Sequence, residues 1–497
     1  MRPVCPPLPD IPKAMDWEKF RSDGHKMIDF IADYYKSLSE NKFPPQSAVQ
    51  PGYLKKAIVE TEAPLEPQQD FSGVLADIQK HIVPGMTHWQ HKNFYAWFPA
   101  QLSPPALLGD TIASSLNQPG FNWMASPAAS ELEVIVTNWM SGAFGLPADM
   151  TWEGTGGGVL QPSATEAASV VVLAAKNRSL SRFSTLEEKG AAASKLVAYV
   201  SDQAHFCTEK ACRILSIFHV RKIKTYRRED GNYPMSAAEL EKVMAEDVKN
   251  GLIPCFLGVN YGTTGICAWD DFADIAALPL VKEYHVWINL DAAYAGAVAL
   301  CPELRDPLLP AFDVVDSLWV NGSKWFSLMT NCTFQFFRDR HYIVQSLNAT
   351  GIYLANKHTE ADAVVDFKDY HLGMGRPFRA LKVYTTLQMM GVDGIRATVR
   401  RHCTLAKYLH DLLSNDPIFE LPLPPKFGLV CVRLAGDEDN SKTRKLLQKL
   451  EEDRTYMVVS HELEGKVIIR IALAHPQLTQ TDMEEMADFL SQQAKQV

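Results

Sequence analysis

Four polar features of this sequence could do chemistry together, and the first is a glycine-rich turn that leads directly into a predicted helix. The turn reads Thr155-Gly-Gly-Gly-Val-Leu-Gln-Pro-Ser-Ala-Thr. Backbone amides at a helix start, together with the hydroxyls of Ser163 and Thr165, can bind an anion. The segment matches neither the G-x-x-x-x-G-K-[ST] pattern nor the G-x-G-x-x-G pattern. Taken by itself, it is equally consistent with an ordinary tight turn and helix cap.

The other three features are single side chains at the ends of predicted strands. Asp291 ends the apolar run His285–Leu290, where a buried carboxylate is costly unless it is paired or neutralised. Its alternative role is a helix N-cap. His205 follows the strand Leu196–Ser201, where a purely structural histidine is the alternative. Lys324 lies in the stretch VNGSKWF, either as a solvated charge or as an amine in a dry pocket.

These four features form a set that is informative as a whole. Asp291 and Lys324 are about one βα unit apart, which would bring the ends of two adjacent strands to the same sheet edge. The set then offers an anion site, a carboxylate, a stackable ring and an amine. Pyridoxal phosphate needs a phosphate site, a partner for its ring nitrogen and a lysine that forms a Schiff base. An NTPase or dehydrogenase explains only part of the set.

The elements that must position these residues alternate between helix and strand from about residue 87 to residue 376. Such alternation predicts crossover units and a mainly parallel sheet covered on both faces, with ligands at the carboxyl ends of the strands. The predicted helices are Ala164–Lys176 and Ala237–Asn250, and the predicted strands are Leu196–Ser201, Pro254–Asn260, His285–Leu290 and Ser317–Val320.

The two ends of the chain differ from this middle region. A helix is predicted from Asp16 to about Leu38, and its apolar residues cover most of its circumference, which indicates cover by a second subunit. The C-terminal part predicts a smaller α+β unit. Its expected elements are a helix at Ala380–Met390, strands at Phe427–Leu434 and Val467–Leu473, and a last helix that opens with a capping box at Thr481–Glu484.

Composition restricts the classes of partner. The 497-residue chain carries a formal charge of −9, which disfavours nucleic acid as a partner. No apolar run approaches the roughly 20 residues that span a bilayer, so no membrane partner is expected. The nine cysteines are scattered without a C-x-x-C pair, a pattern typical of reduced thiols and not of a disulfide frame or metal site. Without an apolar signal segment at the N-terminus, a cytoplasmic protein is expected.

Eight motifs in a fixed order run through nearly the whole chain. They are MTHWQHKNFYAWFPA (86–100), GFNWMASPAASELE (120–133), GGGVLQPSATEA (156–167), SDQAH (201–205), YGTTGIC (261–267), LDAAYAG (290–296), SKWF (323–326) and GRPFRALK (375–382). With these motifs the sequence resembles the aromatic L-amino-acid decarboxylases, which belong to the group II pyridoxal-phosphate-dependent decarboxylases. The resemblance implies fold type I, a homodimer with shared active sites, and three parts. These are an N-terminal helical segment (1–85), a large cofactor domain (86–378) with a catalytic loop at about 343–362, and a small C-terminal domain (379–497).

The resemblance also implies residue roles. Lys324 corresponds to the lysine that forms the Schiff base, Asp291 to the partner of the pyridinium nitrogen, and His205 to the imidazole stacked on the ring. The remaining cofactor contacts implied are Ser163, Ala164, Thr165, Thr264, Ala293 and Asn321. The substrate pocket implied is Trp89, Trp97, Phe98, Pro99, Pro119, Phe121, His205, Thr330 and Gly375, an aromatic box that would otherwise be an ordinary core cluster.

Tyr353 corresponds to the catalytic-loop phenol that protonates Cα after decarboxylation in this family. Relatives with phenylalanine at this position instead form an aldehyde, ammonia and peroxide, so Tyr353 favours an amine product. The oxidative aldehyde synthase is the alternative on the same scaffold, and a cofactor-binding pseudoenzyme is a second alternative.

Three positions depart from common family patterns or bear on the substrate. Ser323 stands where most members have histidine, and Thr330 replaces a phenylalanine common in animal enzymes. Plant members that prefer indolic substrates tend to carry glycine at the position of Gly375. The missing side chain leaves space for a bicyclic indole ring. Tryptophan is therefore the favoured substrate, followed by tyrosine, dihydroxyphenylalanine and phenylalanine.

Overall fold

The computed structural model describes residues 16–58, 62–349, 358 and 364–497. The chain divides into two compact units, Met1–Phe94 with Arg454–Met457, and Tyr95–Asp453 with Val458–Val497. In the described ranges, no helix is long and apolar enough to cross a membrane. The three-part division with boundaries near residues 86 and 378 stays a prediction.

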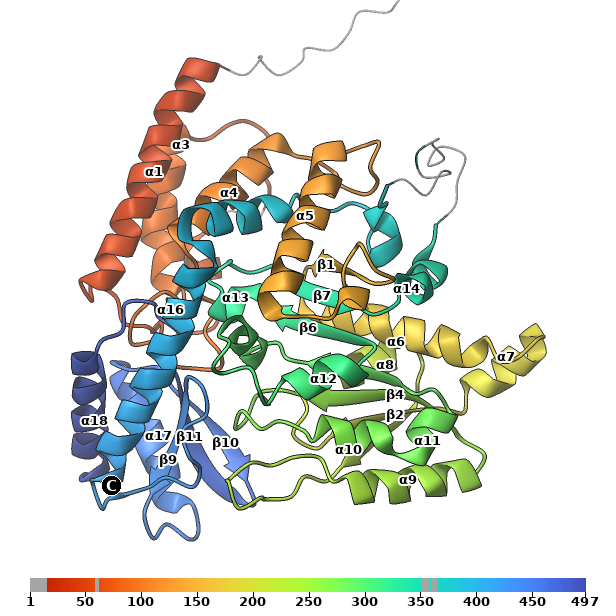
Figure 1. Ribbon diagram of the computed structural model, residues 1–497. Coiled ribbons are helices and arrows are strands. Elements are labelled where there is room, and N and C mark those ends of the chain that lie inside the picture. The colour runs from red at the N-terminus through yellow and green to blue at the C-terminus, as the bar shows by residue number, and fades with distance from the viewer. Residues whose placement is uncertain (1–15, 59–61, 350–357, 359–363) are drawn as a thin grey trace, which may run out of the picture. The chain divides into compact units, whose positions relative to one another are not determined.

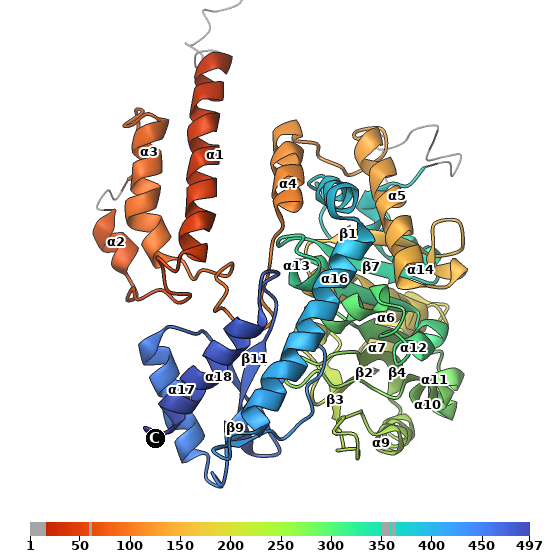
Figure 2. The ribbon, with the colours of Figure 1, turned by 60° about the vertical axis from the view of Figure 1, so that its left-hand side comes forward.

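The first unit is helical. Its main helix, α1 (Trp17–Ser39), begins where the Asp16 carboxylate accepts hydrogen bonds from the amides of Glu18 and Lys19, which confirms the predicted helix. Helix α1 lies beside α3 (Figure 2). Several large apolar side chains of α1, among them Trp17, are exposed. The other elements of this unit are α2 (Tyr53–Ala57), α3 (Phe71–Asp77), a π-helical turn η1 (Ile78–Ile82) and η2 (Val83–Gly85).

The second unit is built on a seven-stranded sheet with strand order β1-β7-β6-β5-β4-β2-β3. Strands β1, β7, β6, β4 and β2 are labelled in Figure 1. Only β7 runs antiparallel to its neighbours, so the expected mainly parallel sheet is confirmed. The strands are β1 (Gly157–Gln161), β2 (Leu196–Ser201), β3 (His219–Ile223), β4 (Ile253–Asn260), β5 (Trp287–Asp291), β6 (Ser317–Asn321) and β7 (Thr333–Phe337).

Helices cover both faces of this sheet, as the strand sequences require. Successive side chains of a strand point to opposite faces. On β5, Trp287 packs into one apolar cluster together with α6 and α8, while Ile288 packs into the other. On β6, Trp319 lies in the first cluster and Leu318 in the second. Both faces of each strand are therefore buried, which explains why these strands lack polar alternation.

The helices of this unit that accompany the large sheet precede, connect or follow its strands. They are α4 (Pro104–Leu116), α5 (Pro127–Phe144), η3 (Ala148–Met150), α6 (Ala164–Leu180), α7 (Leu186–Ala193), α8 (Cys207–Ile214), α9 (Ala237–Lys249), α10 (Phe272–Ala277), α11 (Pro279–Glu283), η4 (Ala295–Leu300), α12 (Leu309–Val314), α13 (Gly322–Trp325), α14 (Arg340–Leu347) and η6 (Phe367–Tyr370).

The C-terminal part forms a smaller antiparallel sheet, with strand order β10-β11-β9-β8. Long helix α16 (Ala380–Ser414) packs on α4 and α5 at one end and on β9 at the other (Figure 1). It bends at Gly391, whose φ of 66° interrupts the helical backbone. The other elements are β8 (Phe419–Glu420), β9 (Leu429–Leu434), α17 (Ser441–Asp453), β10 (Val459–Leu463), β11 (Lys466–Ala472) and α18 (Gln480–Ala494).

The predicted start of the last helix is wrong. Thr479, not Thr481, caps α18, and its side chain and that of Asp482 form the reciprocal capping box. The chain contains two overlapping Thr-x-x-acid patterns, and the first one is used. Glu484 instead accepts a hydrogen bond from the Tyr408 hydroxyl of α16.

A buried ion pair joins α5 to the segment before α16. Arg376 donates two hydrogen bonds to the Glu133 carboxylate at 2.7 and 2.8 Å, and Glu133 also accepts from the Leu160 amide at 2.8 Å. Both charged side chains are almost fully buried. Removal of the arginine would leave an uncompensated carboxylate in the core.

We expect Arg376→Met to lower the free energy of unfolding by about 3–5 kcal/mol, because Glu133 would stay buried without its partner. Urea denaturation measures the change. The matched control is Arg400→Met, since Arg400 pairs with Glu303 where both side chains are about half exposed. Exposed pairs contribute roughly 0–1 kcal/mol. Equal losses in the two variants would contradict the assignment.

Candidate active site

The candidate site is a cavity of about 230 Å³ at the carboxyl edge of the large sheet. Residues at the ends of five parallel strands, β1, β2, β4, β5 and β6, or shortly after these ends, supply its walls. Its lining consists of Ser163, Ala164, Thr165, His205, Asn260, Gly262, Thr263, Thr264, Asp291, Ala293, Asn321 and Lys324.

All nine residues predicted to contact a cofactor line this one cavity. Three further lining residues were missed, namely Asn260, Gly262 and Thr263. They follow the end of β4, and the run Asn-Tyr-Gly-Thr-Thr after an apolar strand was the available signal. Gly262 has a φ of +88°, and a Cβ there would meet Ala295 at 2.4 Å, so only glycine fits the turn.

One end of the cavity is suited to an anion. It lies at the N-terminus of α6, where the amides of Ala164 and Thr165 have no acceptor within the helix. Ser163 caps the helix by accepting from the Glu166 amide at 3.2 Å. The positive end of the helix dipole adds to the attraction.

Asn321 completes this end, and Ser323 fixes its orientation. The amide and the hydroxyl of Ser323 both donate to Oδ1 of Asn321, at 3.0 and 2.8 Å. A backbone amide can only donate, so the atom that faces Ser323 must be the carboxamide oxygen. The Nδ2 group of Asn321 is thereby left as a donor for the cavity. Serine at position 323 thus has a structural role in this chain.

Asp291 provides the negative group of the cavity. Its Oδ1 accepts hydrogen bonds from the Trp319 indole at 2.9 Å and from the Ala293 amide at 3.0 Å. The Cys207 thiol lies 3.7 Å from Oδ2. The carboxylate is therefore held by donors from β6, from its own strand end and from α8, and it ends β5 instead of capping a helix.

The His205 imidazole lines the cavity as a neutral ring. Its Nδ1 accepts a hydrogen bond from the Cys207 amide at 3.2 Å, so the ring proton of the neutral form is on Nε2. Burial lowers the pKa of His205, and although the Asp291 carboxylate opposes this shift, the Lys324 ammonium adds to it. The imidazole therefore stays uncharged near neutral pH.

Lys324 stands in the short helix α13, directly after β6. Burial lowers the pKa of its ammonium, and the Asp291 carboxylate partly opposes that shift. A lysine with a lowered pKa carries more free amine at neutral pH and is a better nucleophile. Its Nζ lies 5.3 Å from the centre of the Phe98 ring, which forms an aromatic wall beside it.

Unlike the predicted cofactor residues, the predicted substrate residues do not converge on one cavity. Phe98 lies against Lys324, and its ring stacks on Tyr294 at 3.7 Å. Trp97 is exposed and has a left-handed φ of 52°, while Pro99 is buried. Trp89 belongs to the other compact unit, where its ring lies 4.6 Å from that of Phe94.

Of the nine predicted substrate residues only His205 lines the cavity, and the other eight lie outside its lining. Pro119, Thr330 and Gly375 are exposed and Phe121 is half-buried. Three buried cations of the segment 376–382 donate hydrogen bonds to these residues or to their chain neighbours. Arg376 donates to the Gly120 carbonyl, Arg379 to Asn331 and Lys382 to the Thr330 carbonyl. Their substrate role stays a prediction. Tyr353 and much of the predicted catalytic loop lie outside the described residues.

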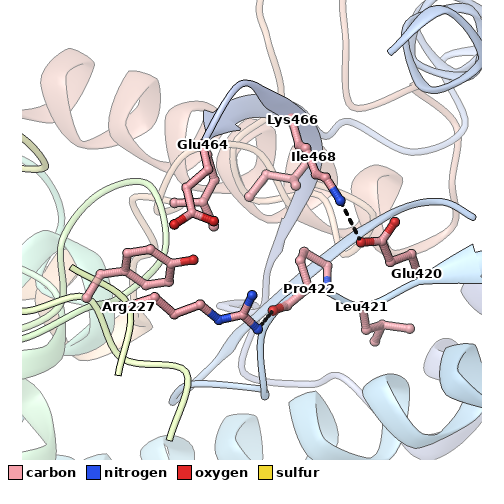
Figure 3. A pocket seen from close by; sticks show the side chains of 9 residues that line it. Arg227, Glu420, Leu421, Pro422, Glu464, Lys466 and Ile468 are labelled. Atoms are coloured by element: carbon pink, nitrogen blue, oxygen red, sulfur yellow. Dashed lines mark hydrogen bonds and ion pairs between the residues drawn. The ribbon is translucent and has the colours of Figure 1, made fainter. Parts of the chain in front are cut away.

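A second cavity of about 230 Å³ lies between the Arg227–Tyr233 segment and the small sheet (Figure 3). Three of its charged side chains, Arg227, Glu420 and Lys466, are bound by one another or by the backbone. Lys466 pairs with Glu420 at 3.4 Å, and Arg227 donates to the Pro422 carbonyl at 3.2 Å. Its amine, that of Lys466, is thus engaged in an ion pair, and among the described residues no helix N-terminus lines this cavity. Within the described ranges, no cluster of three His, Cys, Asp or Glu side chains could hold a metal ion.

Comparison with known proteins identifies the family to which this arrangement belongs. Residues 51–435 match the model of the pyridoxal-dependent decarboxylase conserved domain. The chain belongs to that family. Because the matched segment contains every residue that lines the cavity, the protein is a decarboxylase, a lyase, that uses pyridoxal phosphate.

Individual relatives of this decarboxylase cover nearly the full chain. Tryptophan decarboxylase 2 of Oryza sativa subsp. japonica is 37% identical over 98% of this chain and 96% of its own length. Phenylacetaldehyde synthase of Arabidopsis thaliana is 36% identical over 97% of each chain. The crystal structure of Oryza sativa TDC with pyridoxal phosphate and tryptamine superposes with a TM-score of 0.92 at 32% identity, over 98% of this chain and 99% of that one. The likeness confirms fold type I.

The residues of this decarboxylase fit pyridoxal phosphate. The phosphate would find the free amides of α6 and the Nδ2 group of Asn321. The ring nitrogen would find the Asp291 carboxylate, and the aldehyde the Lys324 amine. The cavity lies just below the roughly 300–1,000 Å³ of typical drug-sized ligand sites, which suits a compact, single-ring group.

We expect borohydride reduction of the cofactor-loaded protein to attach pyridoxal phosphate to Lys324 alone, because this amine faces the cavity with a lowered pKa. Peptide mass analysis locates the label. Lys324→Arg should abolish it, since a guanidinium does not form the bond.

Lys426 supplies the matched control for this experiment. Burial lowers its pKa to about 8, yet its ammonium donates to the Gly231 carbonyl and to Asn232 at 3.0 Å each, away from the cavity. Lys426→Arg should therefore keep the label in full. A label on Lys426, or one that survives in Lys324→Arg, would contradict the site.

Proposed function

We propose that this protein decarboxylates an aromatic L-amino acid to the corresponding amine and CO₂, with tryptophan as the favoured substrate, followed by tyrosine, dihydroxyphenylalanine and phenylalanine. The observation that carries the proposal is the convergence of Lys324, Asp291, His205 and an anion-binding helix start on one cavity. The names of the relatives, a tryptophan decarboxylase among them, support the aromatic substrate class.

Bound pyridoxal phosphate supplies an electron-accepting ring for the electrons released when the carboxylate leaves. The chain's own residues prepare that chemistry. Asp291 is held as a hydrogen-bond acceptor and favours a proton on the ring nitrogen. The neutral His205 ring offers a flat, uncharged surface along the cavity wall.

Lys324 contributes a nucleophile and a proton carrier. Its lowered pKa favours the free amine that reacts with an aldehyde. Phe98, beside it, helps to exclude water from this part of the site. Fixed amides at the start of α6 would hold the phosphate group of the cofactor without a counter-charged side chain.

The choice of product depends on the proton donor to Cα. We assign that role to Tyr353, which lies outside the described residues, on the strength of the family pattern around it. The oxidative aldehyde synthase is the second candidate function, because a phenylacetaldehyde synthase is 36% identical to this chain. The two functions differ in products and are readily distinguished.

The decisive experiment incubates purified protein separately with tryptophan, 5-hydroxytryptophan, tyrosine, dihydroxyphenylalanine and phenylalanine. Amine, CO₂, aldehyde and peroxide are measured together. We expect amine and CO₂ in equal amounts with almost no peroxide, and the highest kcat/KM for tryptophan. Aldehyde with stoichiometric peroxide would establish the synthase instead. Cofactor binding without turnover of any of these substrates would indicate a pseudoenzyme.

Two variants sharpen this assay. Tyr353→Phe removes the phenol and should shift the product from amine towards aldehyde and peroxide, whereas an unchanged mixture would exclude Tyr353 as proton donor.

Gly375→Ser should favour phenolic over indolic substrates, because the added side chain takes space. A Cβ at Gly375 meets no atom of its own chain within 4 Å, so the fold itself should tolerate the change.

We also propose that the protein is a homodimer with shared active sites. Leu108, Ile112 and Leu116 form an exposed apolar stripe on α4 at helical spacing, and Ile135 and Trp139 are similarly exposed on α5. Exposed apolar side chains concentrated in this way are typical of an interface. The exposed substrate residues described above could then serve the site of a second copy.

Sedimentation equilibrium tests the dimer. We expect twice the chain mass of 55.5 kDa for the natural protein and a shift towards monomer for Leu108→Lys combined with Ile112→Lys, because two charges would be buried. Leu186→Lys is the control, since this leucine is 83% exposed on α7, away from the stripe. A natural protein that stays monomeric at micromolar concentration would refute the proposal.

A further inference from the structure

Trp319 donates a hydrogen bond to Asp291, and the function proposed above assigns no role to this residue. Trp319 occupies the position on β6 that pairs in parallel register with Asp291 on β5. Register partners of adjacent parallel strands project to the same face of the sheet. The Trp319 indole accordingly donates to Oδ1 of Asp291 at 2.9 Å.

The indole is a rigid anchor. Trp319 is fully buried, within the apolar cluster formed by this face of the sheet and α6. Close packing leaves such a ring a single orientation, so its N–H group points in a fixed direction. The Ala293 amide donates to the same oxygen at 3.0 Å, and Oδ1 is therefore bound by two donors of fixed position.

The second carboxylate oxygen is less firmly held. The Cys207 thiol lies 3.7 Å from Oδ2 of Asp291, and a thiol is a weak hydrogen-bond donor. Burial raises the pKa of Cys207, so the sulfur keeps its proton and contributes no competing charge. Of the two oxygens, Oδ2 has the lone pairs that remain available to a ligand in the cavity.

We propose that Trp319 is a positioning residue that holds Oδ1 of Asp291 so that Oδ2 presents itself to the protonated ring nitrogen of the cofactor. The inference rests on the proposed role of Asp291. Trp319 would touch neither substrate nor cofactor and would act only through the carboxylate. Its contribution should appear only with ligands that carry a ring nitrogen.

The test measures binding by the cofactor-free full-length protein of two ligands. One is pyridoxal phosphate, and the other is its carbon analogue, in which a C–H group replaces the ring nitrogen. Trp319→Phe removes the indole N–H and keeps an aromatic side chain. We expect this variant to bind pyridoxal phosphate about tenfold more weakly, the size of effect of a lost hydrogen bond to a charged group. Binding of the carbon analogue should change less than about twofold.

Trp287→Phe is the matched control. Trp287 is also a buried tryptophan on the same face of the sheet, but its indole donates to Ser317 at 2.9 Å, away from the cavity. Thermal unfolding should report a similar loss of stability in both variants. We expect Trp287→Phe to leave the ratio of the two affinities unchanged.

Two results would overturn the inference: equal weakening of both ligands in Trp319→Phe, or no weakening of either. Failure of the underlying assignment has a different signature. If the natural protein itself binds the two ligands equally, Asp291 is not the partner of the ring nitrogen, and the variant is not needed to show it.

Discussion

Partial burial of the Asp291 carboxylate at the end of β5 is the constraint on which the rest of the site depends. Transfer of an unpaired carboxylate into a protein interior costs several kcal/mol, so the chain must surround it with donors or neutralise it. Trp319 and Ala293 bind one oxygen, and the amine of Lys324 faces the same cavity. Asp291 ends β5, and Ala293 and Lys324 follow the ends of β5 and β6, which the parallel sheet brings to one edge, while Trp319 is the register partner of Asp291 within β6.

The charges of the cavity are distributed to match a ligand with two unlike ends. The start of α6 attracts an anion without a side-chain cation, while Asp291 attracts a protonated ring nitrogen. Lys324 and His205 are both driven towards their neutral forms by burial. One physical cause, exclusion of water at the sheet edge, thus yields a nucleophilic amine and an uncharged ring in the same place.

The sequence alone predicted the parallel sheet, because alternating helices and strands are a local signal, and the nine cofactor residues implied by the family resemblance all line one cavity. Trp319 could not be found in this way, since its role follows from the register of β5 against β6. The wrong start of α18 has a local cause: two Thr-x-x-acid patterns overlap, and sequence does not say which one caps. Pro119, Thr330 and Gly375 are exposed and lie outside the lining of the cavity, so their substrate role stays a prediction.

The account's central claim is that one cavity holds the cofactor through Lys324 and Asp291. A crystal structure of the protein with bound pyridoxal phosphate tests it most directly. We predict a covalent bond from Lys324 Nζ to the cofactor, the ring nitrogen within hydrogen-bonding distance of Asp291 Oδ2, and the phosphate at the amides of Ala164 and Thr165. A cofactor bound to another lysine, or one whose ring nitrogen faces away from Asp291, would contradict the account.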